Sequence, residues 1–172
     1  IKYLDLAGVK IDKGFDLLVY GNIPNGAGLS SSASLEMLVA YALNQEFQGG
    51  LTRPELAQVG MQVANQFIGV NSGIMDQFAV AMGQLDHGIF LDVNTMEYEM
   101  VPADFQDYKI LIMNTNKRRE LADSKYNQRR QECEEALSRL QGELAIASLG
   151  ELSSADYESH RHLIGDDVLE RR

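Results

Sequence analysis

A loop rich in glycine and serine, residues 24–34, constrains the fold of this chain more than any other stretch. It reads Pro-Asn-Gly-Ala-Gly-Leu-Ser-Ser-Ser-Ala-Ser. A short segment of strand-forming residues, 14–20, precedes the loop. Apolar residues at helical spacing follow it, namely Leu35, Leu38, Val39, Ala42 and Leu43. The sequence therefore predicts a strand, a tight loop and a helix in direct succession, with one apolar face of the helix buried.

The composition of this loop is suited to holding a phosphate group. Gly26 and Gly28 permit a close approach of the backbone and unusual φ angles. The first N–H groups of the next helix have no partner within that helix, and the helix dipole favours an anion there. The serines add hydroxyls for phosphate or magnesium, although the Lys-Ser/Thr ending of a Walker A loop is missing. A tight turn with a serine N-cap remains the simpler alternative, but it requires only one glycine and one serine.

Helical and strand patterns follow the loop in blocks. Thr52-Arg53-Pro54-Glu55 has the form of a helix start, and a glycine pair, Gly49-Gly50, ends the helix before it. The second helix has an apolar stripe of Leu56, Val59, Val63 and Phe67. Further on, the patterns predict a short helix over 75–82, strands over 87–93, 96–101 and 108–113, and a long polar helix over 119–140. This mixed order indicates an α+β fold.

Charge and composition exclude several classes of protein. The 172 residues carry a net charge of −10, which argues against a nucleic-acid-binding surface. No apolar run reaches the roughly 18 residues that span a bilayer. A single cysteine, Cys133, cannot form an internal disulfide, so we expect a reducing cytoplasm. The three histidines have no metal-ligand spacing, and the sequence does not indicate an oligomeric state.

Most of the basic residues lie in the last third of the chain, with a cluster between Lys117 and Arg130. Such a cluster can meet an anionic ligand. Acidic residues such as Glu120 and Glu132 are interleaved with it, which favours an exposed, solvated helix face.

Three motifs in order resemble the galactokinases, a family of the GHMP small-molecule kinases. Residues 24–34 resemble the second signature of the superfamily, and Gly-Ile-Met-Asp-Gln-Phe at 73–78 narrows the resemblance. Asn-Thr-Asn at 114–116 and Tyr-Asn-Gln-Arg-Arg at 126–130 complete it. The resemblance implies a partial GHMP kinase N-terminal domain in residues 1–113, with its phosphate loop at 24–34. The start of a mainly helical C-terminal domain would then occupy residues 114–172.

The resemblance also implies an activity and a set of site residues. The family transfers phosphate from ATP, with Mg²⁺, to the C1 hydroxyl of D-galactose and produces galactose 1-phosphate. Asp76 matches the family's general base, Gly73 and Tyr126 match sugar contacts, and Ser32 matches a magnesium ligand. The phosphates of ATP would be held by Gly26, Ala27, Gly28, Leu29, Ser30, Ser31 and Ser32.

From the residues alone, two of these assignments have simpler alternatives. Asp76 lies among apolar Ile74, Met75 and Phe78, which suits a partly buried carboxylate with a tunable pKa. It equally suits a first-turn aspartate that interacts with the helix dipole. Tyr126 by itself has the pattern of a surface helix residue.

The chain departs from the family pattern in three places. The family's first and third signatures are missing, and Ala64 stands where an Ala-Glu-Asn segment usually supplies a magnesium-binding glutamate. The chain also begins at Ile1 without an initiator methionine. We therefore expect a portion of a longer enzyme, inactive by itself. The alternatives are a regulator that senses galactose and ATP without catalysis, and a sister kinase for N-acetylgalactosamine.

Overall fold

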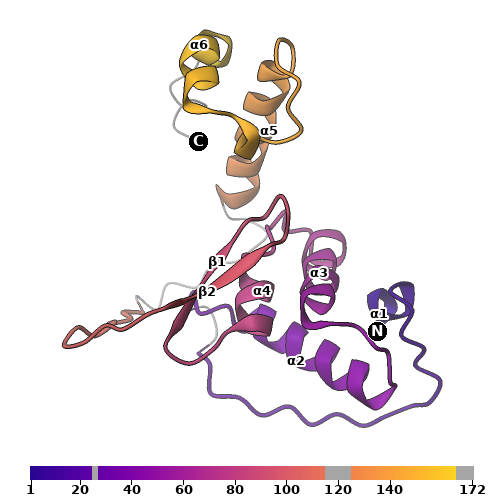
Figure 1. Ribbon diagram of the computed structural model, residues 1–172. Helices are drawn as coiled ribbons and strands as arrows, with labels where there is room; N and C mark the ends of the chain where they lie inside the picture. The colour runs from indigo at the N-terminus through magenta and orange to yellow at the C-terminus, as the bar shows by residue number, and fades with distance from the viewer. Residues whose placement is uncertain (25–26, 115–124, 166–172) are drawn as a thin grey trace. The chain divides into compact units, whose positions relative to one another are not determined.

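The computed structural model describes residues 1–24, 27–114 and 125–165, with the backbone alone described for Lys125 and Tyr126. The chain divides into two compact units, residues 1–119 and 120–172 (Figure 1). The prediction of kinase domains that meet after residue 113 stays a prediction.

The first unit contains helices followed by a β-hairpin. The helices are α1 (Lys2–Leu6), α2 (Ser31–Glu46), α3 (Arg53–Val63), the π-helix η1 (Ala64–Ile68) and α4 (Met75–Met82). Helices α2, α3 and α4 pack against one another in pairs. Their shared core includes Met37, Leu43, Leu56 and Phe78, and Val9 from the segment after α1 closes it. This helical packing positions the starts of α2 and α4, where the predicted phosphate loop and Asp76 lie.

Strands β1 (His87–Leu91) and β2 (Tyr98–Pro102) form an antiparallel hairpin, with Ile89 opposite Met100. The Phe78 ring on α4 meets the Tyr98 ring edge-on, with 5.3 Å between ring centroids. The hairpin is therefore anchored to the same helix that carries Asp76. These two strands and the helix over 75–82 confirm the corresponding sequence predictions.

The apolar face predicted for α2 is only partly the buried one: Leu43 is buried and Val39 packs against the core, but the other leucines are not buried. Leu35 and Leu38 are 49% and 51% exposed, whereas Ala33, Met37 and Ala40 are buried. The helix is apolar around much of its circumference, so periodicity alone could not select the buried face. Packing against α3 and α4 selects it.

The stripe predicted for the second helix is only partly correct. Leu56 and Val59 are buried, but Phe67 is 79% exposed. The α-helix ends at Val63 and continues as the π-helix η1. A π turn holds more residues than an α turn, so it rotates Phe67 away from the core while Ala64 stays buried.

Two predicted strands, 14–20 and 108–113, are not strands in the described structure. Leu18 is 95% exposed and Leu111 is 79% exposed. A strand requires a hydrogen-bonded neighbour, and β1 and β2 pair with each other. Strand-forming residues without such a neighbour remain extended chain.

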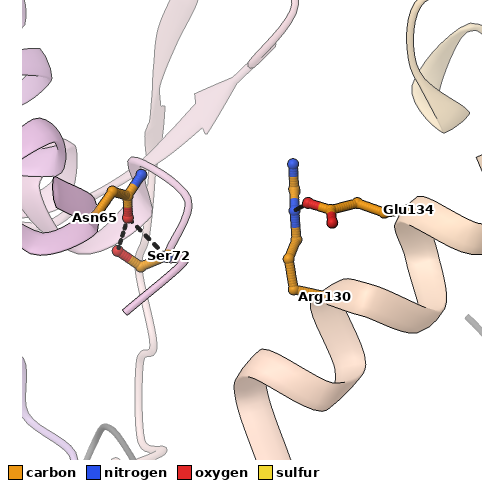
Figure 2. A network of polar contacts seen from close by, with 4 residues as sticks. All are labelled: Asn65, Ser72, Arg130 and Glu134. Atoms are coloured by element: carbon orange, nitrogen blue, oxygen red, sulfur yellow. Dashed lines mark hydrogen bonds and ion pairs between the residues drawn. The ribbon is translucent and has the colours of Figure 1, made fainter. Parts of the chain in front are cut away.

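The second unit consists of α5 (Lys125–Leu140), the 3₁₀-helix η2 (Leu149–Glu151) and α6 (Ser154–Ile164). Its core contains Ala136, Leu140 and Ile164. On the exposed face of α5, Arg130 pairs with Glu134 at 2.9 Å, one turn further along (Figure 2). This pairing favours the solvated-face interpretation for the described part of the basic cluster.

Candidate active site

The phosphate-loop residues that the structure describes lead directly into α2. Gly28 has φ of +74° and Ser30 has φ of +53°, both in the left-handed region. A Cβ on Gly28 would meet no atom within 4 Å, so its glycine serves the backbone conformation rather than close packing. A serine with positive φ is uncommon, and such residues concentrate at functional sites.

Ser30 occupies the N-cap position of α2, but its side chain makes no capping hydrogen bond. The turn with a serine N-cap, the simpler alternative for this loop, therefore lacks its defining contact. Ser34 donates from its backbone N–H to the Ser30 carbonyl at 2.9 Å and begins the helical hydrogen bonds. The N–H groups of residues 31–33 precede this bond and have no partner within the helix.

The hydroxyls at the start of α2 differ in exposure. Ser32 is exposed, whereas Ser30 and Ser31 are half-buried. Ala27 and Leu29 are also half-buried, and buried Ala33 anchors the first turn. Gly26, the other predicted loop glycine, lies outside the described residues. The start of α2 thus combines the hydroxyl of the exposed Ser32 with backbone N–H groups that have no partner within the helix, which suits an anionic ligand.

Asp76 lies in the first turn of α4 and is exposed. The expectation of a partly buried carboxylate is wrong for the described structure. Ile74 and Phe78 are 6% and 1% exposed, and Asp76 lies about 200° around the helix from Ile74. The apolar neighbours in sequence therefore face the core while the carboxylate faces away. The position of Asp76 matches the alternative interpretation, in which it is a first-turn aspartate near the positive end of the helix dipole.

The loop before α4 is tied to the end of η1. Asn65 Oδ1 accepts hydrogen bonds from the Ser72 backbone N–H at 2.9 Å and from Ser72 Oγ at 3.3 Å (Figure 2). Val70 is buried, and its N–H donates to the Ala64 carbonyl at 3.1 Å. These contacts hold the segment that leads through Gly73 to Asp76. Gly73 is exposed, and the position of a Cβ there is open space.

A polar contact joins the helix of the phosphate loop to the helix of Asp76. Gln77 on α4 donates from Nε2 to Glu36 Oε2 on α2, at 3.2 Å. Gln77 is only 4% exposed. Burial raises the pKa of Glu36, and the hydrogen bond from Gln77 partly opposes that effect.

Sequence reasoning missed Glu36, Asn65, Ser72 and Gln77. For Gln77 a signal was present, because it follows Ile74 by three residues and precedes Phe78, which places it at core-facing helical spacing. The contact of Glu36 with Gln77 spans 41 residues of sequence and left no local signal.

The remaining predicted site residues are less defined. Tyr126 lies on α5 in the second unit, and its side chain is outside the described part of the structure. Across the described residues, no group of three His, Cys, Asp or Glu side chains could hold a metal ion. Ala64 is buried, and its side chain cannot bind a metal ion. Of the predicted magnesium ligands, the described residues therefore include the hydroxyl of the exposed Ser32.

Within the described ranges, no helix has the length and apolar character needed to cross a membrane.

Comparison with known sequences finds relatives along the whole chain. Residues 1–84 match the GHMP kinases N terminal domain. The whole chain is 59% identical to a galactokinase of Enterococcus faecalis and 55% identical to one of Staphylococcus carnosus. In both cases the chain spans 44% of the relative's length.

A solved structure is similar to this chain over nearly its whole length. The crystal structure of Lactococcus lactis galactokinase complexed with galactose matches 99% of this chain, with a TM-score of 0.93 and 53% sequence identity. The matched part is 44% of that galactokinase chain. The predicted α+β fold of the GHMP kinase type is confirmed, and the chain corresponds to part of a longer protein architecture.

Proposed function

Because this chain belongs to the galactokinase family over its whole length, we propose that it is part of an ATP-dependent kinase that phosphorylates D-galactose at the C1 hydroxyl. The product would be galactose 1-phosphate. The observation that carries the proposal is the start of α2, where Gly28 and Ser30 take left-handed conformations ahead of N–H groups that have no partner within the helix. The same proposal places the enzyme in the cytoplasm, where ATP is available and Cys133 stays reduced.

Asp76 would act as the general base in this reaction. Its carboxylate would accept the proton of the C1 hydroxyl while that oxygen attacks the γ-phosphorus of ATP and the bond to ADP breaks. General base catalysis contributes roughly 10² to 10⁴-fold. Positioning and charge stabilisation supply most of the remainder in phosphoryl transfer.

The phosphate loop would supply part of that charge stabilisation. Backbone N–H groups of residues 27–33 would face the phosphates, and Ser32 would offer its hydroxyl to Mg²⁺. The ion, when bound, would neutralise charge on the phosphate oxygens. Gly73 would leave room for the sugar beside Asp76, and Tyr126 would be a further sugar contact, as the family resemblance implies.

Replacement of Asp76 tests the proposal directly. In the longer enzyme that contains this chain, Asp76→Asn should lower kcat by about 10²-fold or more and leave the Kd for ATP unchanged. An ADP-release assay measures the first quantity and calorimetry the second. Asp5→Asn, an exposed aspartate on α1, is the matched control and should retain full turnover. Unchanged turnover in Asp76→Asn would refute the assigned role.

The second candidate function is a regulator that binds galactose and ATP without catalysis. Ala64 favours it, because alanine replaces the carboxylate expected to bind magnesium. Galactose binding by the longer protein without ADP release would support this candidate. The same assay on the 172-residue chain tests our expectation that this portion is inactive alone, and N-acetylgalactosamine as substrate tests the sister kinase.

A further inference from the structure

Gln77 is a buried polar residue placed directly after the proposed catalytic base. Its Nε2 donates to Glu36 Oε2 on α2 at 3.2 Å. Its Oε1 is buried and has no donor among the described residues. Burial of an amide costs free energy unless its hydrogen bonds are made, so an apolar side chain at this position would serve the core better. A contribution to stability therefore does not explain why the residue at position 77 is polar.

The packing around Gln77 leaves little freedom of movement. A Cβ on Gly60 of α3 would lie 2.9 Å from Gln77 Cγ and 3.2 Å from Met37 Sδ. The Gln77 side chain thus rests on the backbone of α3 while its amide reaches α2. One side chain consequently makes contact with both other helices of the core.

These contacts hold Gln77 of α4 between α2 and α3. Asp76 precedes Gln77 on α4, so a rotation of this helix that lifts Gln77 from Gly60 also moves the Asp76 carboxylate. The partner Glu36 lies on α2, five residues after Ser31, where the phosphate loop leads into the helix. The contact therefore links the two parts of the proposed site.

We propose that Gln77 is a positioning residue that, through its hydrogen bond to Glu36 and its seat on Gly60, sets the place of Asp76 relative to the phosphate loop. The inference rests on the proposed function, since it assumes that Asp76 is the base. A displacement of about 1 Å can cost roughly 10²-fold in rate, so a single contact of this kind has a measurable effect.

Glu36 supplies the acceptor of this contact. It is half-buried; burial raises its pKa, and the hydrogen bond from Gln77 partly opposes that effect. Glutamine at position 36 would keep an acceptor for Gln77 Nε2 and would add an N–H donor for the buried Gln77 Oε1.

Four variants of the longer enzyme test the proposal: Gln77→Met, Glu36→Met, the double variant, and Glu36→Gln. Methionine keeps the length of the side chain and removes its hydrogen bonds. We expect each single methionine variant to lower kcat by about tenfold or more, with KM for ATP and galactose within about twofold. The double variant should be no slower than the worse single variant, because both remove the same contact. Glu36→Gln should retain kcat within about threefold.

The matched control is Glu46→Met on the same helix. Glu46 is exposed and pairs with Lys13 at 2.7 Å, near the far end of α2 from the phosphate loop. Its removal should leave kcat unchanged. Thermal melting of each variant confirms that assays are run on folded protein. If Gln77→Met does not fold, the kcat of Glu36→Met tests the same hydrogen bond, because Glu36 is half-buried and its replacement disturbs the core less.

Three outcomes would overturn the inference: full kcat in Gln77→Met, additive losses in the double variant, or an equal loss in Glu36→Gln and Glu36→Met. Failure of the proposed function would give different results. If the proposed function were wrong, the unaltered enzyme would release no ADP, or Asp76→Asn would keep its activity. An enzyme that needs Asp76 but tolerates Gln77→Met would refute the positioning role alone.

Discussion

Asn44 shows how one buried side chain shapes the chain around it. Asn44 is 2% exposed, and its amide mimics a strand partner for Leu51. Its Nδ2 donates to the Leu51 carbonyl at 2.9 Å, and its Oδ1 accepts from the Leu51 N–H at 3.1 Å. The turn between α2 and α3 therefore folds back onto α2. Gly49 lies inside this turn, against Val9.

Gly49→Ala should destabilise the first unit. A Cβ at this position would lie 2.5 Å from Val9 Cγ2 and 2.6 Å from Asn44 Oδ1. Overpacking of this kind costs about 1–3 kcal/mol, and here it also disturbs the two Asn44 hydrogen bonds. Urea denaturation measures the free energy of unfolding.

Gly14→Ala is the matched control for this substitution, because a Cβ there would meet no atom within 4 Å. Its effect should stay within about 0.5 kcal/mol. Equal stability of the Gly49 and Gly14 variants would contradict the predicted clash.

For single residues, the sequence predicted backbone conformation better than it predicted burial and contacts. The unusual φ expected of Gly28 is present in the structure. The environment of Asp76 was predicted incorrectly, because its neighbours in sequence are not its neighbours in space. The buried Gln77 was identifiable only in part, since its partner Glu36 comes from a different helix.

The start of α3 has a complete capping box. Thr52 Oγ1 accepts from the Glu55 N–H at 3.4 Å, and Glu55 Oε2 accepts from the Thr52 N–H at 2.7 Å. Pro54 stands in the first turn, where a missing N–H has no cost. This capping box confirms the helix start that the sequence predicted.

Loss of the Thr52 hydroxyl should weaken α3. Thr52→Ala removes the side-chain acceptor, which typically costs about 1 kcal/mol. Thr52→Ser keeps a hydroxyl at the same position and should keep the stability of the unaltered protein. Urea denaturation of the two variants compares them, and a serine variant as unstable as the alanine variant would contradict a capping role.

The capping box also predicts a dependence of stability on pH. Hydrogen bonds from Thr52 lower the pKa of Glu55 below its ordinary value of 4.5. A pKa that is lower in the folded state means that the ionised carboxylate stabilises the fold. This contribution is fully present above pH 4.5 and is lost as the pH falls through the folded pKa.

Comparison with Glu55→Gln isolates this effect. The stability advantage of the unaltered protein over Glu55→Gln should shrink as the pH is lowered from about 6 to about 3. Denaturation curves across that range measure it. An advantage that stays constant with pH would show that the ionised carboxylate is not the stabilising group.

Elements were predictable where their ends carry local signals. Thr52 and Glu55 marked the start of α3, and Gly83 marked the end of α4. The π-helix η1 was not predictable, because its extra residue per turn has no composition of its own. Its position decides that Phe67 faces away from the core.

Two exposed apolar segments distinguish the first unit as a whole. Residues 14–20 include Leu18 and Tyr20, which are 95% and 92% exposed, and residues 108–113 include Leu111 and Met113, which are 79% and 80% exposed. Contiguous apolar exposure of this kind marks a surface that another segment covers. In the proposed longer enzyme, further chain is available for this, since the 172 residues span 44% of the relatives' length.

The 172-residue chain prepared alone should therefore bind a hydrophobic dye. The double variant Leu18→Lys, Leu111→Lys should bind less dye, because it places a charge within each apolar segment. Leu85→Lys, which alters a single exposed leucine outside both segments, should have a smaller effect. Dye fluorescence at equal protein concentration measures the difference. Equal binding by all three proteins would show that the two segments do not form the apolar surface.

The sequence by itself determined the features that depend on a few neighbouring residues. These are the glycine-serine loop at the start of α2, the capping box of α3 and the limits of α4, because backbone conformation and capping act within one turn of chain. The tertiary structure decided which face of α2 is buried, whether residues 14–20 and 108–113 pair, and how Asp76 is exposed. It also joined Glu36 to Gln77 across 41 residues. Each of these depends on a partner distant in sequence, whose position only the folded chain defines.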